Sequence, residues 1–198
     1  MSVVDDRQQR RRARVLRVCR SVHRTTGALL FAFFMVVSAT GLLLGWKKDT
    51  GGLILAKTYE GTSTDLKDWL PVHVLHEKAV AALRLSVSPD LSLELDRIDM
   101  RPDKGTVKFV FVEHYWGVQI DGATGNVLHI ERRRADLIEN IHDGSVLDYL
   151  AGTAGGQIKL AYTSVMGLAL LTFTLTGFWL WYGPKRFRAK SKSHRREA

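Results

Sequence analysis

Residues 27–46 read GALLFAFFMVVSATGLLLGW, and residues 160–182 read LAYTSVMGLALLTFTLTGFWLWY. Neither stretch contains Asp, Glu, Lys or Arg. Because an α-helix rises about 1.5 Å per residue, about 20 residues cross a hydrocarbon core of about 30 Å. The sequence therefore predicts two transmembrane helices, over residues 27–46 and 158–182, and argues against a simple soluble enzyme.

Basic residues flank the two apolar stretches. Residues 1–26 contain eight Arg against two Asp, and residues 183–198 contain seven Lys or Arg against one Glu. An excess of Lys and Arg is typical of the cytoplasmic side of a membrane protein. We therefore expect a bacterial inner-membrane protein with a cytoplasmic N-terminal segment (1–26), a cytoplasmic tail (183–198) and a periplasmic, extracytoplasmic region (47–157). A basic arm that binds nucleic acid is disfavoured, because topology and attraction to anionic lipid explain the charge.

The first apolar stretch is predicted to remain as an anchor. It is longer than the core of a secretory signal peptide, which spans about 7–15 residues. The single cysteine, Cys19, falls on the predicted cytoplasmic side. We therefore expect no disulfide framework and no thiolate metal site outside the membrane.

The region between the two spans has the pattern of one small α+β domain. Apolar residues at helical spacing predict a helix over residues 70–85. Alternation, and enrichment in β-branched and aromatic residues, predict strands over residues 91–100, 106–113, 116–120 and 126–130. A helix-rich connection over residues 134–150 then leads through Gly152–Gly156 to the second span, which Pro184 is predicted to end.

Several motifs in this order resemble those of PepSY-associated transmembrane proteins. The run WGVQIDGATGNVL (116–128) resembles the strand hairpin of PepSY domains. VHRTTG (22–27), with TGLL (40–43), resembles the first helix of these proteins, and IHDGS (141–145), with LTGFWLW (175–181), resembles their last helix. The similarity covers roughly residues 15–185 and implies a PepSY-like extracytoplasmic domain between the two spans.

The resemblance also implies a function. Some larger members of this family contain haem b and reduce ferric siderophores or pass electrons outward, and they have more spans than this chain. The chain is therefore expected to form a homodimer, to join another membrane subunit, or to have lost the redox role. We expect haem-b-linked electron transport of the iron or siderophore reduction type. The alternative is a non-catalytic accessory subunit whose PepSY domain binds or regulates a partner protein.

His23 and His142 are the candidate cofactor-binding residues, as axial ligands of haem iron. A neutral imidazole is a common axial ligand, and the resemblance places a ligand candidate at His23. His142 precedes Asp143, which could fix the tautomer of a ligating imidazole, and Gly144, which would let a macrocycle approach. The alternatives are an interfacial His23 beside the lipid head groups and a His142 that ends a surface helix. If both bind haem, they do so on opposite membrane faces.

Other polar residues carry weaker signals. His73 and His76 lie on one helical face and could hold a metal, although an ordinary exposed face is favoured. His114 and His129 are expected to fall in strands and to be structural or exposed. The triplet Arg132–Arg134 could attract an anion or belong to a charge-balanced surface. Small residues in the spans predict close helix packing, a dimer contact or a slot for a porphyrin. Neither apolar stretch, 27–46 or 160–182, contains a charged residue, which argues against an ion transporter. No catalytic pattern decides whether the chain is an enzyme.

Overall fold

The computed structural model describes residues 3–153 and 155–194, which fall into two compact units. We call them the helical unit, which comprises the chain up to Ala39 and from His142 onward, and the sheet unit, Thr40–Ile141. The sequence analysis placed the end of the outer domain at residue 157. The sheet unit ends earlier, because the short helix α4 (Ser145–Leu150) groups with the long helices.

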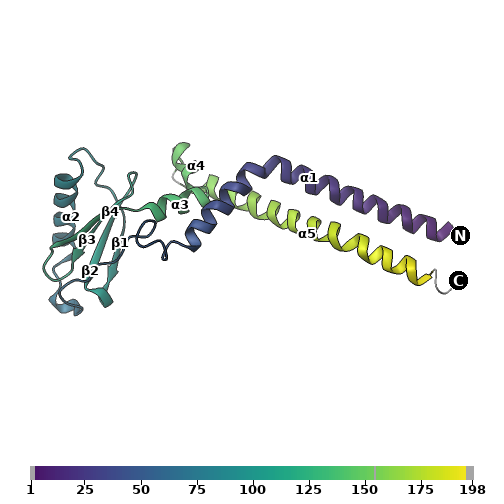
Figure 1. Cartoon of the computed structure of the whole chain (residues 1–198). Helices are drawn as coiled ribbons and strands as arrows, with labels where there is room; N and C mark the ends of the chain where they lie inside the picture. Colours follow the sequence, from purple (N-terminus) through teal and green to yellow (C-terminus); the bar gives the residue numbers. More distant parts are fainter. Residues whose placement is uncertain (1–2, 154, 195–198) are drawn as a thin grey trace. The chain divides into compact units, whose positions relative to one another are not determined.

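Two long antiparallel helices form the helical unit (Figure 1). They are α1 (Val3–Gly45), of which the part up to Ala39 belongs here, and α5 (Gln157–His194). Phe173 packs on Phe34 with ring centroids 5.8 Å apart, and Leu16 lies against Gly183 near the other end of the contact. By length and composition, both helices are long and apolar enough to cross a membrane.

Both helices extend beyond the predicted spans. The basic segment that the sequence analysis separated from the first span is part of the same helix, which begins at Val3. The prediction that Pro184 ends the second span is wrong, because α5 continues through Pro184 to His194. Proline removes one backbone hydrogen bond from a helix, and the Lys- and Arg-rich sequence that follows consists of good helix formers.

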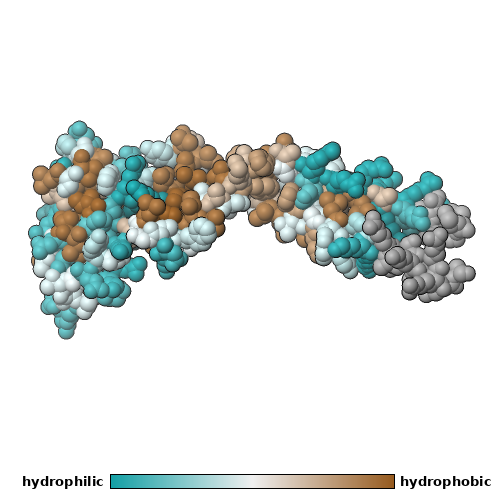
Figure 2. Space-filling view, viewed as in Figure 1, coloured by the Kyte–Doolittle hydropathy of each residue, from teal (hydrophilic) through white to brown (hydrophobic). Residues whose placement is uncertain are grey.

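The apolar side chains of the helical unit point mostly outward. Several large ones are more than half exposed, among them Leu29, Phe31, Met35, Leu168 and Leu171. In Figure 2 the visible face of the helix pair changes from hydrophobic to hydrophilic toward the chain ends. A continuous exposed apolar surface needs a partner, which is either a lipid bilayer or other helices.

The sheet unit contains a four-stranded antiparallel sheet in the order β1-β2-β3-β4. The strands are β1 (Leu95–Arg101), β2 (Thr106–Phe111), β3 (Trp116–Asp121) and β4 (Val127–Arg132). Two α-helices, α2 (Val72–Ser86) and α3 (Arg134–His142), and the 3-10 turns η1 (Leu66–Asp68) and η2 (Pro102–Lys104) complete the elements between the long helices. The predicted α+β arrangement of one helix with a small antiparallel sheet is confirmed.

Helix α2 covers one face of the sheet (Figure 1) and builds the hydrophobic core. Leu75, Ala79 and Leu83 recur at helical spacing and are fully buried. They pack on inward-facing residues of the two central strands: Val107, Phe109, Phe111, Val118 and Ile120.

The opposite face of the sheet is polar but also covered. Strand alternation places Thr106, Lys108 and Val110 of β2 on this face, and all three are buried. The segment that precedes α2 runs over it. Gln119 of β3 holds this segment, since its amide oxygen accepts from the Tyr59 backbone N–H at 3.1 Å and its amide nitrogen donates to the Lys57 carbonyl at 2.8 Å. The polar face of the sheet is therefore covered by other parts of the sheet unit and is not open to solvent along β2.

Candidate functional site

His23 lies in the contact between α1 and α5, one turn before Gly27. Its ring stacks on the ring of Phe173, with centroids 3.9 Å apart and an interplanar angle of 22°. Nδ1 lies 3.1 Å from the Phe173 carbonyl oxygen and 3.1 Å from Thr176 Oγ1. The imidazole is therefore held on both its face and its edge by the second long helix.

These contacts determine which nitrogen of His23 carries hydrogen. A carbonyl oxygen can only accept a hydrogen bond, and the Thr176 hydroxyl has carbonyl acceptors of its own, Thr172 at 2.7 Å and Phe173 at 3.1 Å. Nδ1 of His23 is therefore assigned as the donor, and in the neutral imidazole the lone pair is on Nε2. Nε2 has no hydrogen-bond partner among the described residues, and His23 is partly exposed. This tautomer suits a metal ligand.

Glycines make the close approach at His23 possible. A Cβ at Gly177 would lie 3.2 Å from Cε1 of His23, and a Cβ at Gly27 would lie 2.9 Å from the ring of Phe173. At Gly27 and Gly177 the space between the helices is therefore filled by aromatic rings of the same chain. At Gly167 a Cβ would meet nothing within 4 Å, so this small position of α5 is open.

His142 is the last residue of α3 and is partly buried. Asp143 was expected to fix the tautomer of His142. Its carboxylate instead accepts from the Ser145 backbone N–H at 2.9 Å and the Ser145 hydroxyl at 2.6 Å, and it also pairs with Lys159. Burial raises the pKa of Asp143, but the hydrogen bonds from Lys159 and Ser145 outweigh it, and the pKa is lowered. The space over Gly144 is filled by the Tyr162 ring, which a Cβ would approach to 2.4 Å.

His23 and His142 are too far apart to share one metal ion. Asp143 pairs with Lys159 near the start of α5, whereas His23 stacks on Phe173. The helix between these two α5 residues is about 20 Å long at about 1.5 Å per residue. Two separate ligand sites are therefore the only arrangement in which both histidines bind iron.

The polar second face of the sheet contains a cavity of about 400 Å³ within the sheet unit. Lys108 lies in β2, one of the two central strands of the sheet, and is only 8 % exposed. Arg101 and Asp99 of β1, Glu131 of β4 and Arg133 line the cavity with it, and Ile54, Leu55 and Ala135 supply apolar surface. This arrangement can hold a small ligand that has both a charged and an apolar part.

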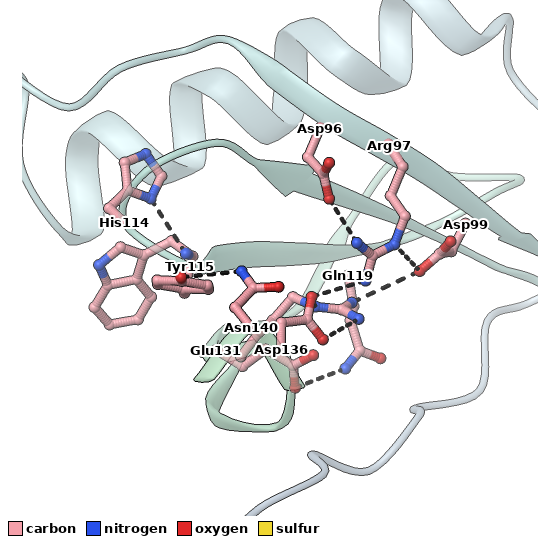
Figure 3. A network of polar contacts seen from close by, with 11 residues as sticks. Asp96, Arg97, Asp99, His114, Tyr115, Gln119, Glu131, Asp136 and Asn140 are labelled. Atoms are coloured by element: carbon pink, nitrogen blue, oxygen red, sulfur yellow. Dashed lines mark hydrogen bonds and ion pairs between the residues drawn. The ribbon is translucent and has the colours of Figure 1, made fainter. Parts of the chain in front are cut away.

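The acidic groups of the cavity are engaged by protein (Figure 3). Asp136 accepts from Arg133 Nε and from Arg97, both at 2.7 Å, and Asp99 lies 3.5 Å from Arg97 Nε. Glu131 accepts from the Gln119 amide at 3.2 Å. Arg133 is therefore balanced by an acid, as predicted, but its side chain is only 12 % exposed, so it does not belong to a solvated surface.

Asp136 makes the sheet unit sensitive to acid. Burial raises its pKa, but hydrogen bonds and charge from Arg133 and Arg97 outweigh burial and lower it. A carboxylate with a lowered folded pKa stabilises the fold above its unfolded pKa, about 3.9, and this stability is lost as pH falls through the folded value. We expect Asp136→Asn to cost about 1.5–3 kcal/mol at pH 7 and much less at pH 3. Urea unfolding of the full chain at both pH values measures this. An equal cost at both values would contradict it.

The other histidines have different surroundings. His114 lies in the turn between β2 and β3, not in a strand; Nδ1 accepts from the Trp116 backbone N–H at 3.2 Å, and Nε2 donates to the Ser92 carbonyl at 2.9 Å. It is structural, as expected. His73 is exposed, whereas Nε2 of His76 is buried without a hydrogen-bond partner. Across the described part of the chain, no group of three potential metal ligands occurs.

Sequence reasoning did not identify Lys108 or Arg101. A signal for Lys108 was present, because it is the one charged residue in the apolar strand TVKFVF. Alternation alone placed it opposite the α2 face, but a solvated face is the usual interpretation of such a residue. Only the fold shows that the preceding segment and α3 cover that face.

No protein-family model matches the chain, and no curated protein is significantly similar to it. The assignment of function therefore depends on the residues themselves.

Proposed function

We propose that the chain is an inner-membrane protein that supports haem-b-linked electron transfer across or near the bilayer, of the type that serves iron or siderophore reduction. The observation that carries this proposal is the placement of His23, whose Nδ1 lies 3.1 Å from two oxygens of α5 while Nε2 has no hydrogen-bond partner among the described residues. Haem b would supply a one-electron redox centre. In this proposal His23 would hold the haem near the cytoplasmic ends of the spans, and His142 would be the candidate ligand on the other face.

The chain's own residues have defined roles in this mechanism. Thr176 and the Phe173 carbonyl orient the imidazole and hold its hydrogen on Nδ1, which leaves the lone pair of Nε2 for a ligand. Phe173 covers one face of the imidazole and limits its rotation. Each chain offers one such imidazole at this level, so a homodimer, or a complex with another membrane subunit, supplies the second.

Membrane insertion is the part of the proposal that the exposed apolar side chains support. In addition, Lys185 Nζ lies 3.9 Å from the centroid of the Trp181 ring, a cation–aromatic pair suited to a membrane interface. Protease added to intact spheroplasts is expected to cut within residues 47–157 and to leave both termini intact. Cleavage of the tails with an intact central region would overturn the topology.

The optical spectrum of the detergent-solubilised chain tests the redox role. We expect a low-spin b-type spectrum that changes on reduction with dithionite. The protein should be expressed with sufficient haem supply, and haem should be quantified against protein. A colourless, folded chain after haem reconstitution would overturn the redox proposal.

One observation favours the second candidate, an accessory subunit whose outer domain binds a partner protein. Aromatic rings of the same chain fill the helix contact at Gly27 and Gly177, so the helix pair packs without a cofactor. A colourless chain that co-purifies with a defined membrane enzyme would support this candidate.

A further inference from the structure

We propose that the cavity on the second face of the sheet is a binding site for a small organic monocarboxylate, or for a chain end with the same chemistry, whose carboxylate pairs with Lys108. The cavity lies wholly within the sheet unit and requires no haem, so its test is independent of the redox proposal.

The first step of the argument is the state of Lys108. It is more than nine-tenths buried, it lines the cavity, and within the described residues it has no hydrogen bond or ion pair. A buried ammonium without a partner is costly, so such a group is typically paired with a ligand. Burial lowers the pKa of Lys108 and so do Arg133 and Arg101, whereas Glu131 and Asp99 raise it.

The second step is the charge balance. Three basic and three acidic side chains line the cavity: Arg101, Lys108, Arg133, Asp99, Glu131 and Asp136. Arg97, beside the cavity, pairs with Asp96, Asp99 and Asp136, so the whole network has four basic and four acidic groups and is balanced. The acids are already paired or hydrogen-bonded to Arg97, Arg133 and Gln119, which leaves Lys108 and Arg101 without an acidic partner among the described residues. A ligand carboxylate would supply that partner to Lys108.

The third step is the apolar lining. Ile54, Leu55 and Ala135 form part of the wall, and Ile54 is held by the hydrogen bond from the Ala135 backbone N–H to its carbonyl, at 3.1 Å. A free phosphate would leave this surface without contacts, whereas a carboxylate attached to a short aliphatic group would cover it. The cavity of about 400 Å³ has room for such a ligand.

N-acetyl-leucine is a suitable probe, and N-acetyl-leucinamide is its neutral counterpart. Calorimetric titration of the full chain in nanodiscs should show saturable binding of the acid and about tenfold weaker binding of the amide. Inorganic phosphate should bind more weakly than the acid. The peptide N-acetyl-Gly-Gly-Leu distinguishes the sources: tighter binding than N-acetyl-leucine indicates a chain end, and equal or weaker binding indicates a small acid.

Lys108→Met keeps the aliphatic stem and removes the charge. We expect it to weaken N-acetyl-leucine binding at least about tenfold and to preserve or raise the thermal stability of the unliganded chain, because an unpaired buried charge is lost. Lys104→Met is the matched control; Lys104 pairs with Glu60 at 2.7 Å outside the cavity lining, and its removal should leave binding unchanged.

Four results would overturn the proposal. They are unchanged binding in a folded Lys108→Met variant, equal binding of acid and amide, stronger binding of phosphate than of the acid, and no saturable binding of the acid. A strong loss of stability in unliganded Lys108→Met would also contradict it, because that loss would indicate an internal partner for the ammonium.

Discussion

A His23→Ala/His142→Ala double variant of the full chain is expected to purify without haem, and each single variant is expected to retain about half of the wild-type amount. The physical reason is the separation of the two imidazoles. The α5 segment between Lys159 and Phe173, which contact Asp143 and His23 respectively, is about 20 Å long, so the two histidines would have to bind different haem groups. Haem content per chain and the reduced-minus-oxidised spectrum measure the effect.

His129→Ala is the matched control for this experiment. His129 lies in β4 and contacts the Tyr59 ring at a tilt of 39°, with centroids 4.9 Å apart, within the sheet unit. Its removal should leave haem content unchanged. If His23→Ala retains the wild-type haem content and the same low-spin spectrum, His23 is not a ligand and the redox proposal loses the observation that carries it.

Thr176→Val separates positioning of the imidazole from ligation. Valine keeps the shape of threonine and removes one of the two oxygens to which Nδ1 donates. Loss of such an orienting partner costs about 10–100-fold in metal affinity, so this variant should hold haem at least about tenfold more weakly and still show a low-spin spectrum. A purely structural threonine would change the stability of the helix pair without changing the affinity.

The sequence predicted the elements of the sheet unit well because their periodicity is local. The helix predicted over residues 70–85 is α2 (Val72–Ser86), and Pro71 precedes its first turn as the N-cap. The first strand is shorter than predicted, because Leu91 and Leu93 pack on the core without joining the ladder, and a register shift follows Leu95. The alternation of apolar and polar residues shows only which side chains are buried. It therefore could not distinguish a loop packed on the core from a strand.

The long-range contacts were outside the reach of sequence patterns. Stacking of His23 on Phe173 joins residues far apart in the chain, and a single sequence contains no sign of which aromatic ring fills which glycine notch. The same holds for Arg97 and Asp136, which pair across the second face of the sheet. That Lys108 has no ion pair could be recognised only from the structure, because it depends on the partners that the neighbouring acids take.

Phe109→Ala is expected to unfold the sheet unit while the long helices persist. Phe109 is fully buried in the middle of β2, where α2 packs on it. Truncation of a buried Phe costs about 3–5 kcal/mol, and a small domain has only about 5–15 kcal/mol of stability. The loss is therefore a large part of the total. Limited proteolysis of the full chain in nanodiscs should show rapid cleavage within Thr40–Ile141.

The division of the chain into two compact units makes this prediction specific. The α1–α5 contact at His23 involves no residue of the sheet core, so helical circular dichroism and haem content should remain close to those of the wild type. Val127→Ala is the control, because Val127 in β4 is 43 % exposed and its truncation should cost about 0.5 kcal/mol or less. If Phe109→Ala loses haem and helicity together with the sheet unit, the two units fold as one, and the long helices depend on the sheet unit for their stability.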